Sequence, residues 1–174
     1  FQEIEILETE YFGKMMILDG VIQTTAFDEY IYHEMIVHVP MLTHPDPKKI
    51  LVIGGGDGGS VREIIKHSGV VKVDWVDIDG KVIEACRKYM PEWNPMIQNS
   101  PVVELKIQDG LKHMKESQGQ YDVIVVDCSD PVGPGELLFR HDFYEDVYGA
   151  LKEDGLFVQQ TESPFYHQDL IRRI

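Results

Sequence analysis

Residues 50–59 read Ile-Leu-Val-Ile-Gly-Gly-Gly-Asp-Gly-Gly, and this stretch gives the strongest indication of the fold class. Its four apolar residues form a short continuous run, which is typical of a strand buried on both faces of a parallel sheet. The glycines have the spacing Gly-x-Gly-x-x-Gly, which lets the backbone approach a ligand closely where the next helix begins. No Gly-Lys-Ser/Thr follows, so the turn is not a phosphate loop of the Walker type. The glycine spacing alone also fits a tight structural turn.

Strand-like and helix-like segments alternate along the chain after this turn. Apolar runs predict further strands at 71–78, 102–107, 121–126 and 156–160. Helical spacing of the apolar residues predicts helices at 61–67, 81–89, 111–115 and 143–152. Continuous apolar strands that alternate with helices indicate a doubly wound α/β domain with a mainly parallel sheet.

The first fifty residues have a different pattern. Segments 2–8 and 14–18 have the composition of strands, and Asp19-Gly20 is a strong signal for a two-residue hairpin turn. Helical spacing covers 29–39, and Pro40 is expected to end that helix. We therefore predict a small antiparallel β-hairpin domain with a linking helix over residues 1–45, followed by the doubly wound domain over residues 46–174.

The composition is that of an acidic globular protein. The 174 residues include 16 Lys and Arg against 30 Asp and Glu, a formal charge of −14, and 43% of them are hydrophobic. Nucleic acids and anionic membranes are therefore poor partners, because both are bound through clustered cationic side chains. The charge favours a cationic ligand instead.

Other features of the sequence concern the setting and the extent of the chain. Cys86 and Cys128 are too few for a disulfide framework or a zinc cluster, which favours a reducing, cytoplasmic setting. No apolar run approaches the roughly 20 residues that span a bilayer, and no signal peptide is visible.

The sequence starts at Phe1 inside a strand-like segment and stops at Ile174 inside a helix-like one. We therefore expect both domains to be incomplete and the isolated segment to be inactive.

Acidic residues stand where the predicted strands end. In a parallel sheet these ends lie together and ligands bind just outside them, so we expect a concave anionic cleft. Asp77 is suitably placed to accept the hydroxyls of a ribose, and Asp109 to contact an adenine edge. The acids at strand ends are Asp57, Asp77, Asp79, Asp109, Asp127 and Asp130.

Asp57 makes the glycine turn unusual. In dinucleotide-binding proteins the pyrophosphate lies at this turn, and a carboxylate there would repel it. The turn therefore favours a ligand that is neutral or positive at this point, which argues against an NAD-dependent dehydrogenase. A solvated turn aspartate is the alternative interpretation.

Several specific segments occur together and in order along the chain. They are 18–23 (LDGVIQ), 28–35 (DEYIYHEM), 54–59 (GGGDGG), 76–79 (VDID), 108–110 (QDG) and 127–134 (DCSDPVGP). With this combination the whole chain resembles the polyamine aminopropyltransferases, and in particular the spermidine synthases among them. The combined pattern is far more specific than the glycine turn alone.

The resemblance implies a fold and a reaction. The expected fold is the Rossmann-like fold of the class I methyltransferases, preceded by the small antiparallel β domain. The expected reaction moves the aminopropyl group of decarboxylated S-adenosylmethionine to putrescine, which gives spermidine and 5′-methylthioadenosine. Family members are commonly dimers or tetramers, so the expected partners are small cationic amines, a sulfonium nucleoside and further copies of the chain.

The resemblance also implies roles for individual residues. Asp127 is expected to be the catalytic proton acceptor. The amine substrate is expected to contact Tyr32, His33, Asp57, Asp127 and Asp130. The nucleoside part of the donor is expected to contact Gln2, Gln23, Asp57, Asp77, Asp109, Gly110 and Pro134.

Neither a cofactor nor a metal ion is expected, because the donor is a co-substrate. His33 and His38 do not have the spacing of a helical zinc pair, which needs histidines four residues apart. The sequence leaves the acceptor amine open, since agmatine or another polyamine is an alternative to putrescine. It also leaves open a diamine N-methyltransferase that uses intact S-adenosylmethionine, and a non-catalytic nucleoside-binding relative.

Overall fold

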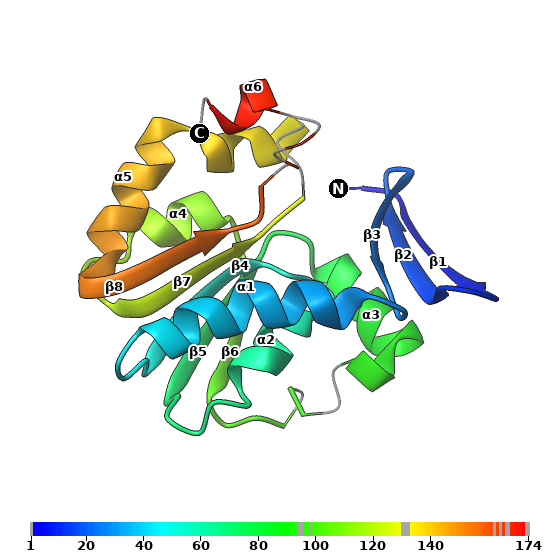
Figure 1. Ribbon diagram of the computed structural model, residues 1–174, viewed down its shortest axis with the longest axis horizontal. Coiled ribbons are helices and arrows are strands. Elements are labelled where there is room, and N and C mark those ends of the chain that lie inside the picture. Colours follow the sequence, from blue (N-terminus) through cyan, green and yellow to red (C-terminus); the bar gives the residue numbers. More distant parts are fainter. Residues whose placement is uncertain are drawn as a thin grey trace.

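The computed structural model describes residues 2–93, 96–97, 99–129, 133–161, 163, 165 and 168–172. It contains two separate sheets (Figure 1). The smaller sheet is antiparallel, in the order β1 (Ile4–Thr9), β2 (Gly13–Leu18) and β3 (Val21–Thr25). Asp19 and Gly20 both have positive φ, as a two-residue hairpin turn requires, so the predicted hairpin is confirmed.

The larger sheet has five strands, all parallel to their neighbours, in the order β6-β5-β4-β7-β8. Its strands are β4 (Lys49–Gly54), β5 (Lys72–Asp77), β6 (Val103–Ile107), β7 (Tyr121–Asp127) and β8 (Leu151–Gln159). The chain runs outward from β4 to β6 and then returns to the other side of β4 through β7. Ligands of doubly wound sheets bind at such a reversal, which here lies outside the carboxyl ends of the neighbouring strands β4 and β7.

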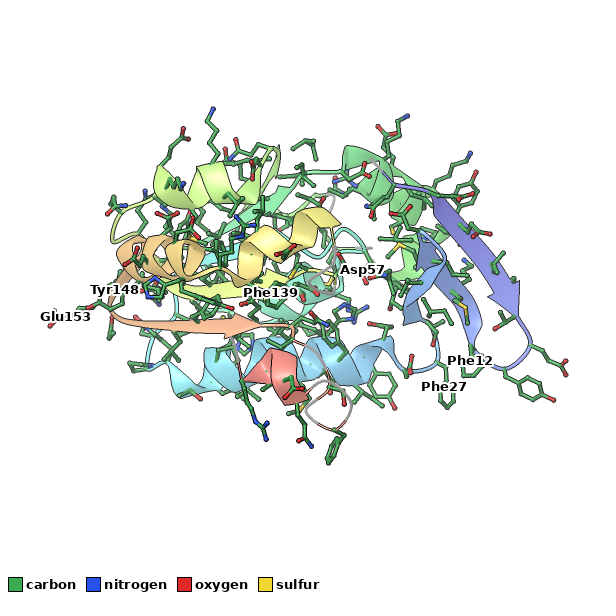
Figure 2. All side chains as sticks on the ribbon, turned by 90° about the horizontal axis from the view of Figure 1, so that it is seen from above. Phe12, Phe27, Asp57, Phe139, Tyr148 and Glu153 are labelled. Carbon is green, nitrogen blue, oxygen red and sulfur yellow. The ribbon has the colours of Figure 1, made fainter. Side chains whose placement is uncertain are left out.

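Helices cover both faces of the larger sheet (Figure 2). The helices are α1 (Glu29–Thr43), α2 (Gly59–Ile64), α3 (Gly80–Tyr89), α4 (Gly110–Lys115), α5 (His141–Ala150) and α6 (Gln168–Ile171), with 3₁₀ helices η1 (Pro91–Trp93) and η2 (Gly133–Phe139). Alternate residues of β4 pack on opposite faces. Ile50 and Val52 pack with α1 and α2, whereas Leu51 and Ile53 pack with α4 and α5. The predicted doubly wound α/β fold is confirmed.

Two element boundaries differ from those predicted. Helix α1 continues through Pro40 to Thr43, so the prediction that Pro40 ends the helix was wrong. Proline has no N–H to donate to the carbonyl of Ile36. However, Pro40 is buried, Met41 packs in the core against the sheet, and the N–H of His44 donates to the Pro40 carbonyl. Strand β8 begins directly after α5, at Leu151 rather than Leu156, and its register with β7 shifts between these two residues.

Helix α3 joins the two sheets. Met16 of β2 packs against Val82, Cys86 and Met90 in a buried cluster. This contact holds the small sheet close to the carboxyl ends of β4 and β5. The division of the chain at residue 45 stays a prediction, and helix α1 itself contacts α2, β7 and β8. Among the described residues, no helix combines the length and the apolar character that crossing a membrane requires.

Candidate functional site

A cavity of about 520 Å³ lies between the carboxyl ends of the parallel strands and the small sheet. Most of the residues predicted for the site line this one cavity. They are Gln2, Gln23, Tyr32, His33, Asp57, Asp77, Asp109, Gly110 and Asp127. Asp130 lies outside the described residues, as does the side chain of Pro134, whose backbone belongs to η2.

The glycine turn lets the backbone pass close to two site residues. Gly55 has a φ of 62°, and its N–H donates to the backbone carbonyl of Asp127 at 2.7 Å. A Cβ atom at Gly55 would lie 2.9 Å from the Asp127 carboxylate, and one at Gly59 would overlap the imidazole of His33. The glycines are therefore needed for packing as well as for backbone conformation.

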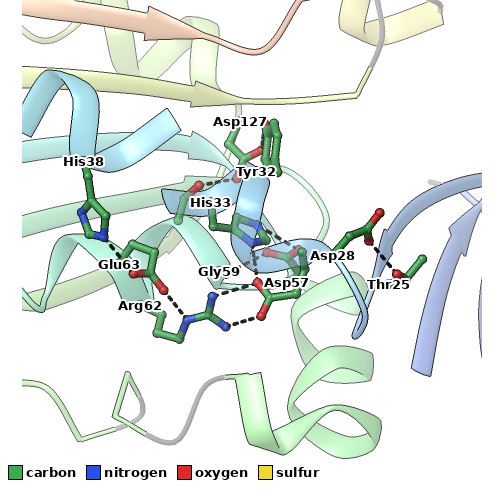
Figure 3. A network of polar contacts seen from close by, with 12 residues as sticks. Thr25, Asp28, Tyr32, His33, His38, Asp57, Gly59, Arg62, Glu63 and Asp127 are labelled. Atoms are coloured by element: carbon green, nitrogen blue, oxygen red, sulfur yellow. Dashed lines mark hydrogen bonds and ion pairs between the residues drawn. The ribbon is translucent and has the colours of Figure 1, made fainter. Parts of the chain in front are cut away.

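His33 is held between two carboxylates (Figure 3). Its Nδ1 lies 2.7 Å from Oε2 of Glu29, one helical turn earlier, and its Nε2 lies 3.4 Å from Oδ2 of Asp57. Burial opposes protonation of the ring, but the charge of Asp57 and the hydrogen bonds to both carboxylates outweigh it and raise the pKa of His33 to about 10. His33 is therefore an imidazolium that donates from both nitrogens.

The cation at His33 keeps Asp57 ionised. Burial favours the protonated acid, yet the charge and hydrogen bond of His33 and the backbone N–H of Gly59 lower the pKa of Asp57. The N–H of Gly59 donates to Oδ1 of Asp57 at 2.8 Å, so the carboxylate is fixed by the turn in which it lies. Asp57 is only 6% exposed, which makes it a buried negative charge on the cavity wall.

Arg62 extends this network away from the cavity (Figure 3). Its two terminal nitrogens donate to the two oxygens of Glu29 at 3.0 and 2.8 Å, and its Nε donates to Glu63 at 2.8 Å. Glu63 also contacts His38 and Lys66. The guanidinium orients Glu29 through a planar two-point contact, and Glu29 in turn orients His33.

Both oxygens of Asp127 accept hydrogen bonds. The hydroxyl of Tyr32 donates to Oδ1 and the hydroxyl of Ser60 donates to Oδ2, each at 2.6 Å. Burial raises the pKa of Asp127; the cation at His33 opposes this, whereas the charge of Asp57 adds to it. The net effect is a pKa above the ordinary value, which makes Asp127 a stronger base than a solvated carboxylate.

A second group of polar residues lies at the end of β5. Asp77 accepts a hydrogen bond from the N–H of Asp79 at 2.8 Å, and Gln2 donates to the Asp79 carboxylate at 3.2 Å. Burial, together with the charges of Asp79, Asp127 and Asp57, raises the pKa of Asp77 to about 6, although the Asp79 N–H opposes the shift. The carboxylates in this part of the cavity therefore repel one another, which favours the protonated form of Asp77.

Asp109 and Gln23 also make local contacts. Asp109 caps α4, since its Oδ1 accepts a hydrogen bond from the N–H of Leu111 at 2.9 Å. Gln23 donates to the backbone carbonyl of Val21 at 3.3 Å. Both side chains line the cavity, whose lining also includes the apolar residues Ile53 and Leu111.

The structure adds residues that the sequence analysis did not place at the site. Glu29 could have been found, because it precedes His33 by four residues on a predicted helix. Ser60 and Arg62 carry no such signal, because their partners at the site lie 67 and 33 residues away in the chain. The side chains of His33, Asp57 and Asp127 also place potential metal-ligand atoms within 4.8 Å of one another.

Comparison with known proteins agrees with this geometry. The strand order and the cavity at the strand ends define a doubly wound α/β fold of the Rossmann-like class. The family model described as spermine/spermidine synthase domain matches residues 29–174, and the one described as spermidine synthase tetramerisation domain matches residues 1–26. The chain belongs to the spermine/spermidine synthase family.

Curated relatives cover the whole of this chain. A polyamine aminopropyltransferase of Methanocaldococcus jannaschii is 56% identical over 174 residues, which are 100% of this chain and 59% of the relative. A polyamine aminopropyltransferase of Caldicellulosiruptor saccharolyticus is also 56% identical, and 62% of its length is matched. The chain therefore spans about three fifths of the length of these relatives.

Solved structures are similar over nearly the entire chain. A spermidine synthase crystallised with the transition state analogue AdoDATO matches with a TM-score of 0.95 and 45% identity, over 99% of this chain and 60% of that one. The spermidine synthase of Thermotoga maritima matches with a TM-score of 0.91 and 42% identity, over 99% of this chain and 57% of that one. The expected fold and family are confirmed.

Proposed function

We propose that the full-length protein is a polyamine aminopropyltransferase that uses decarboxylated S-adenosylmethionine and putrescine and forms spermidine and 5′-methylthioadenosine. The observation that carries the proposal is the arrangement of Asp127, Asp57 and Tyr32 in one cavity at the strand ends. Family membership and the names of the relatives support the reaction class.

The charge of the cavity suits these substrates. The donor carries a sulfonium and an ammonium group, and the acceptor carries two ammonium groups. Asp57, Asp77 and Asp127 all line the cavity, so their combined field attracts cations into a partly desolvated space. A polyanionic ligand would be repelled by the same carboxylates.

The chemical step needs a neutral amine. An alkylammonium has a pKa of about 10.4, so forming the free amine at pH 7 costs roughly 5 kcal/mol. The nitrogen lone pair then attacks the carbon next to sulfur, and the electrons of the carbon–sulfur bond pass to the sulfur, which leaves as a neutral thioether. The proton lost by the nitrogen must pass to a base within hydrogen-bond reach.

Asp127 is the proposed acceptor of this proton. It lines the cavity, and its pKa is raised above that of a solvated carboxylate. His33 is unsuitable as the base, because both of its ring nitrogens already donate to carboxylates. Holding the amine and the carbon in line supplies further acceleration, since the reaction joins two separate molecules.

The remaining site residues are proposed to bind the substrates. Tyr32, His33 and Asp57 contact the amine ends of the ligands, together with Asp130. Asp77 binds the ribose hydroxyls, whose donation would relieve the unfavourable charge that raises its pKa. The nucleoside is further held by Gln2, Gln23, Asp109, Gly110 and Pro134.

Asp57 is proposed to select the donor. Intact S-adenosylmethionine carries a carboxylate where the decarboxylated donor has hydrogen, and that carboxylate would meet the ionised, buried side chain of Asp57. Repulsion between like charges therefore disfavours the diamine N-methyltransferase reaction.

The protein is proposed to work without a metal ion. A metal ion would have to displace a proton from His33, and the contacts of this imidazolium with Glu29 and Asp57 oppose that loss. Its two cysteines are free thiols, which supports the expected reducing, cytoplasmic setting. The match of residues 1–26 to a tetramerisation domain supports a homo-oligomer, either a dimer or a tetramer.

An amine panel tests the proposal. The full-length protein is incubated with decarboxylated S-adenosylmethionine and each of putrescine, agmatine, cadaverine and spermidine, and products are measured by mass spectrometry. We expect methylthioadenosine together with spermidine from putrescine. A preference for another amine would replace putrescine as the proposed acceptor. The absence of methylthioadenosine with every amine would refute the proposed reaction. A methylated diamine formed from intact S-adenosylmethionine would establish the alternative activity.

A further inference from the structure

Ser60 contacts the proposed proton acceptor from the interior of the protein. It lies in the first turn of α2, directly after the glycine turn, and its side chain is 0% exposed. Its hydroxyl donates to Oδ2 of Asp127 at 2.6 Å. Tyr32 donates to the other oxygen and lines the cavity, whereas Ser60 is not among the described residues of the cavity wall.

We propose that Ser60 is a positioning residue that fixes the carboxylate of Asp127 and keeps it ionised for catalysis. This inference rests on the proposed role of Asp127 as proton acceptor. Because Ser60 donates from outside the cavity, its hydrogen bond remains in place when substrates fill the site. It therefore fixes one oxygen and leaves the side of the carboxylate that faces the cavity to the substrate amine.

The charges around Asp127 explain why such a donor is needed. Asp57 in the glycine turn and Asp77 at the end of β5 are negative groups that favour a protonated Asp127. His33 and Tyr32, both on α1, act in the opposite direction together with Ser60. A protonated Asp127 cannot accept a proton, so loss of the Ser60 hydroxyl would leave more of the enzyme inactive at low pH.

The test variant is Ser60→Ala in the full-length protein. Alanine adds no atoms and is favourable within a helix, so the variant should fold. We expect kcat to fall by about 10- to 100-fold, because a carboxylate that is no longer fixed is misplaced relative to the amine, and a misplacement of about 1 Å can cost about 100-fold in rate. The acid limb of the pH profile of kcat/KM should move to higher pH, whereas the KM of the donor should stay unchanged.

Two further variants separate positioning from a general loss of stability. Ser60→Thr keeps a hydroxyl and should recover most of the activity and the original pH profile. Ser117→Ala is the matched control, because Ser117 is also a buried serine, 3% exposed, whose hydroxyl donates to a helix carbonyl, that of His113. This control should change neither kcat nor the pH profile.

The outcomes distinguish this inference from the proposed function. An unchanged pH profile and a kcat within twofold of the wild type in Ser60→Ala would overturn the role of Ser60. An equal loss in Ser117→Ala would overturn it as well. If Asp127→Asn retains turnover, the proposed function of Asp127 fails, whatever Ser60 does. If Asp127→Asn abolishes turnover while Ser60→Ala resembles the wild type, only the inference about Ser60 fails.

Discussion

Replacing Arg62 with methionine should destabilise the protein through the network behind His33. The guanidinium pairs with Glu29 and Glu63, whose side chains are only 11% and 1% exposed, and is itself 15% exposed. Removing one partner of a buried ion pair costs about 3–5 kcal/mol. In the variant, Glu29 still pairs with His33 and Glu63 still pairs with Lys66. We therefore expect a loss at the lower end of this range, about 3 kcal/mol.

Urea denaturation of the full-length protein measures this loss. With a denaturant slope of about 2 kcal/mol per molar, the midpoint of Arg62→Met should fall by about 1.5 M. Lys66→Met is the matched control, because Lys66 also pairs with Glu63 but its side chain is 50% exposed. Such an exposed pair contributes about 1 kcal/mol or less. If Arg62→Met lowers the urea midpoint no more than Lys66→Met does, the ion pairs of Arg62 do not contribute as buried pairs.

Three further substitutions test the cavity. Gly59→Ala should displace the imidazole of His33, raising the KM of the amine and lowering the free energy of unfolding by about 1–3 kcal/mol; no change in either would contradict the packing. For Asp77, whose pKa is about 6 in the fold, native stability should decline as the pH rises from about 4 to 6, because the folded protein holds the proton more tightly than the unfolded chain. Asp77→Asn should therefore stabilise the ligand-free protein at pH 7 by about 3 kcal/mol and weaken donor binding. An equal stabilisation at pH 4, where Asp77 is protonated in the fold, would show that the negative charge of Asp77 is not its cause. Asp57→Asn should reduce the preference for decarboxylated over intact S-adenosylmethionine in calorimetry, and an unchanged preference would assign donor selection to other residues.

The sequence predicts the sheet well because its physical signals are local. The apolar runs 50–53, 71–78 and 121–126 are each followed directly by a glycine or an acid, so both the strand and its functional end can be recognised. The helix through Pro40 could not be predicted, because the burial of Pro40 and the packing of Met41 in the core outweigh the missing hydrogen bond. The start of β8 at Leu151 likewise depends on its pairing with Tyr121.

The convergence of the predicted acids on one cavity could be predicted from the sequence, whereas their protonation states could not. Carboxyl ends of parallel strands must converge, which brings Asp57, Asp77 and Asp127 to one cavity. The protonation of these groups depends on contacts between distant segments. Ser60 and Arg62 in particular acquire their roles only when α2 packs beside α1 and β7.

Asp127 is proposed to accept the proton of the attacking amine. Single-turnover measurement of methylthioadenosine release by Asp127→Asn, with donor affinity determined on the same full-length variant, tests it most directly. General base catalysis contributes about 10²–10⁴-fold, so we predict a rate about a thousandfold below the wild type while donor affinity stays within about threefold. A rate within tenfold of the wild type would contradict the claim.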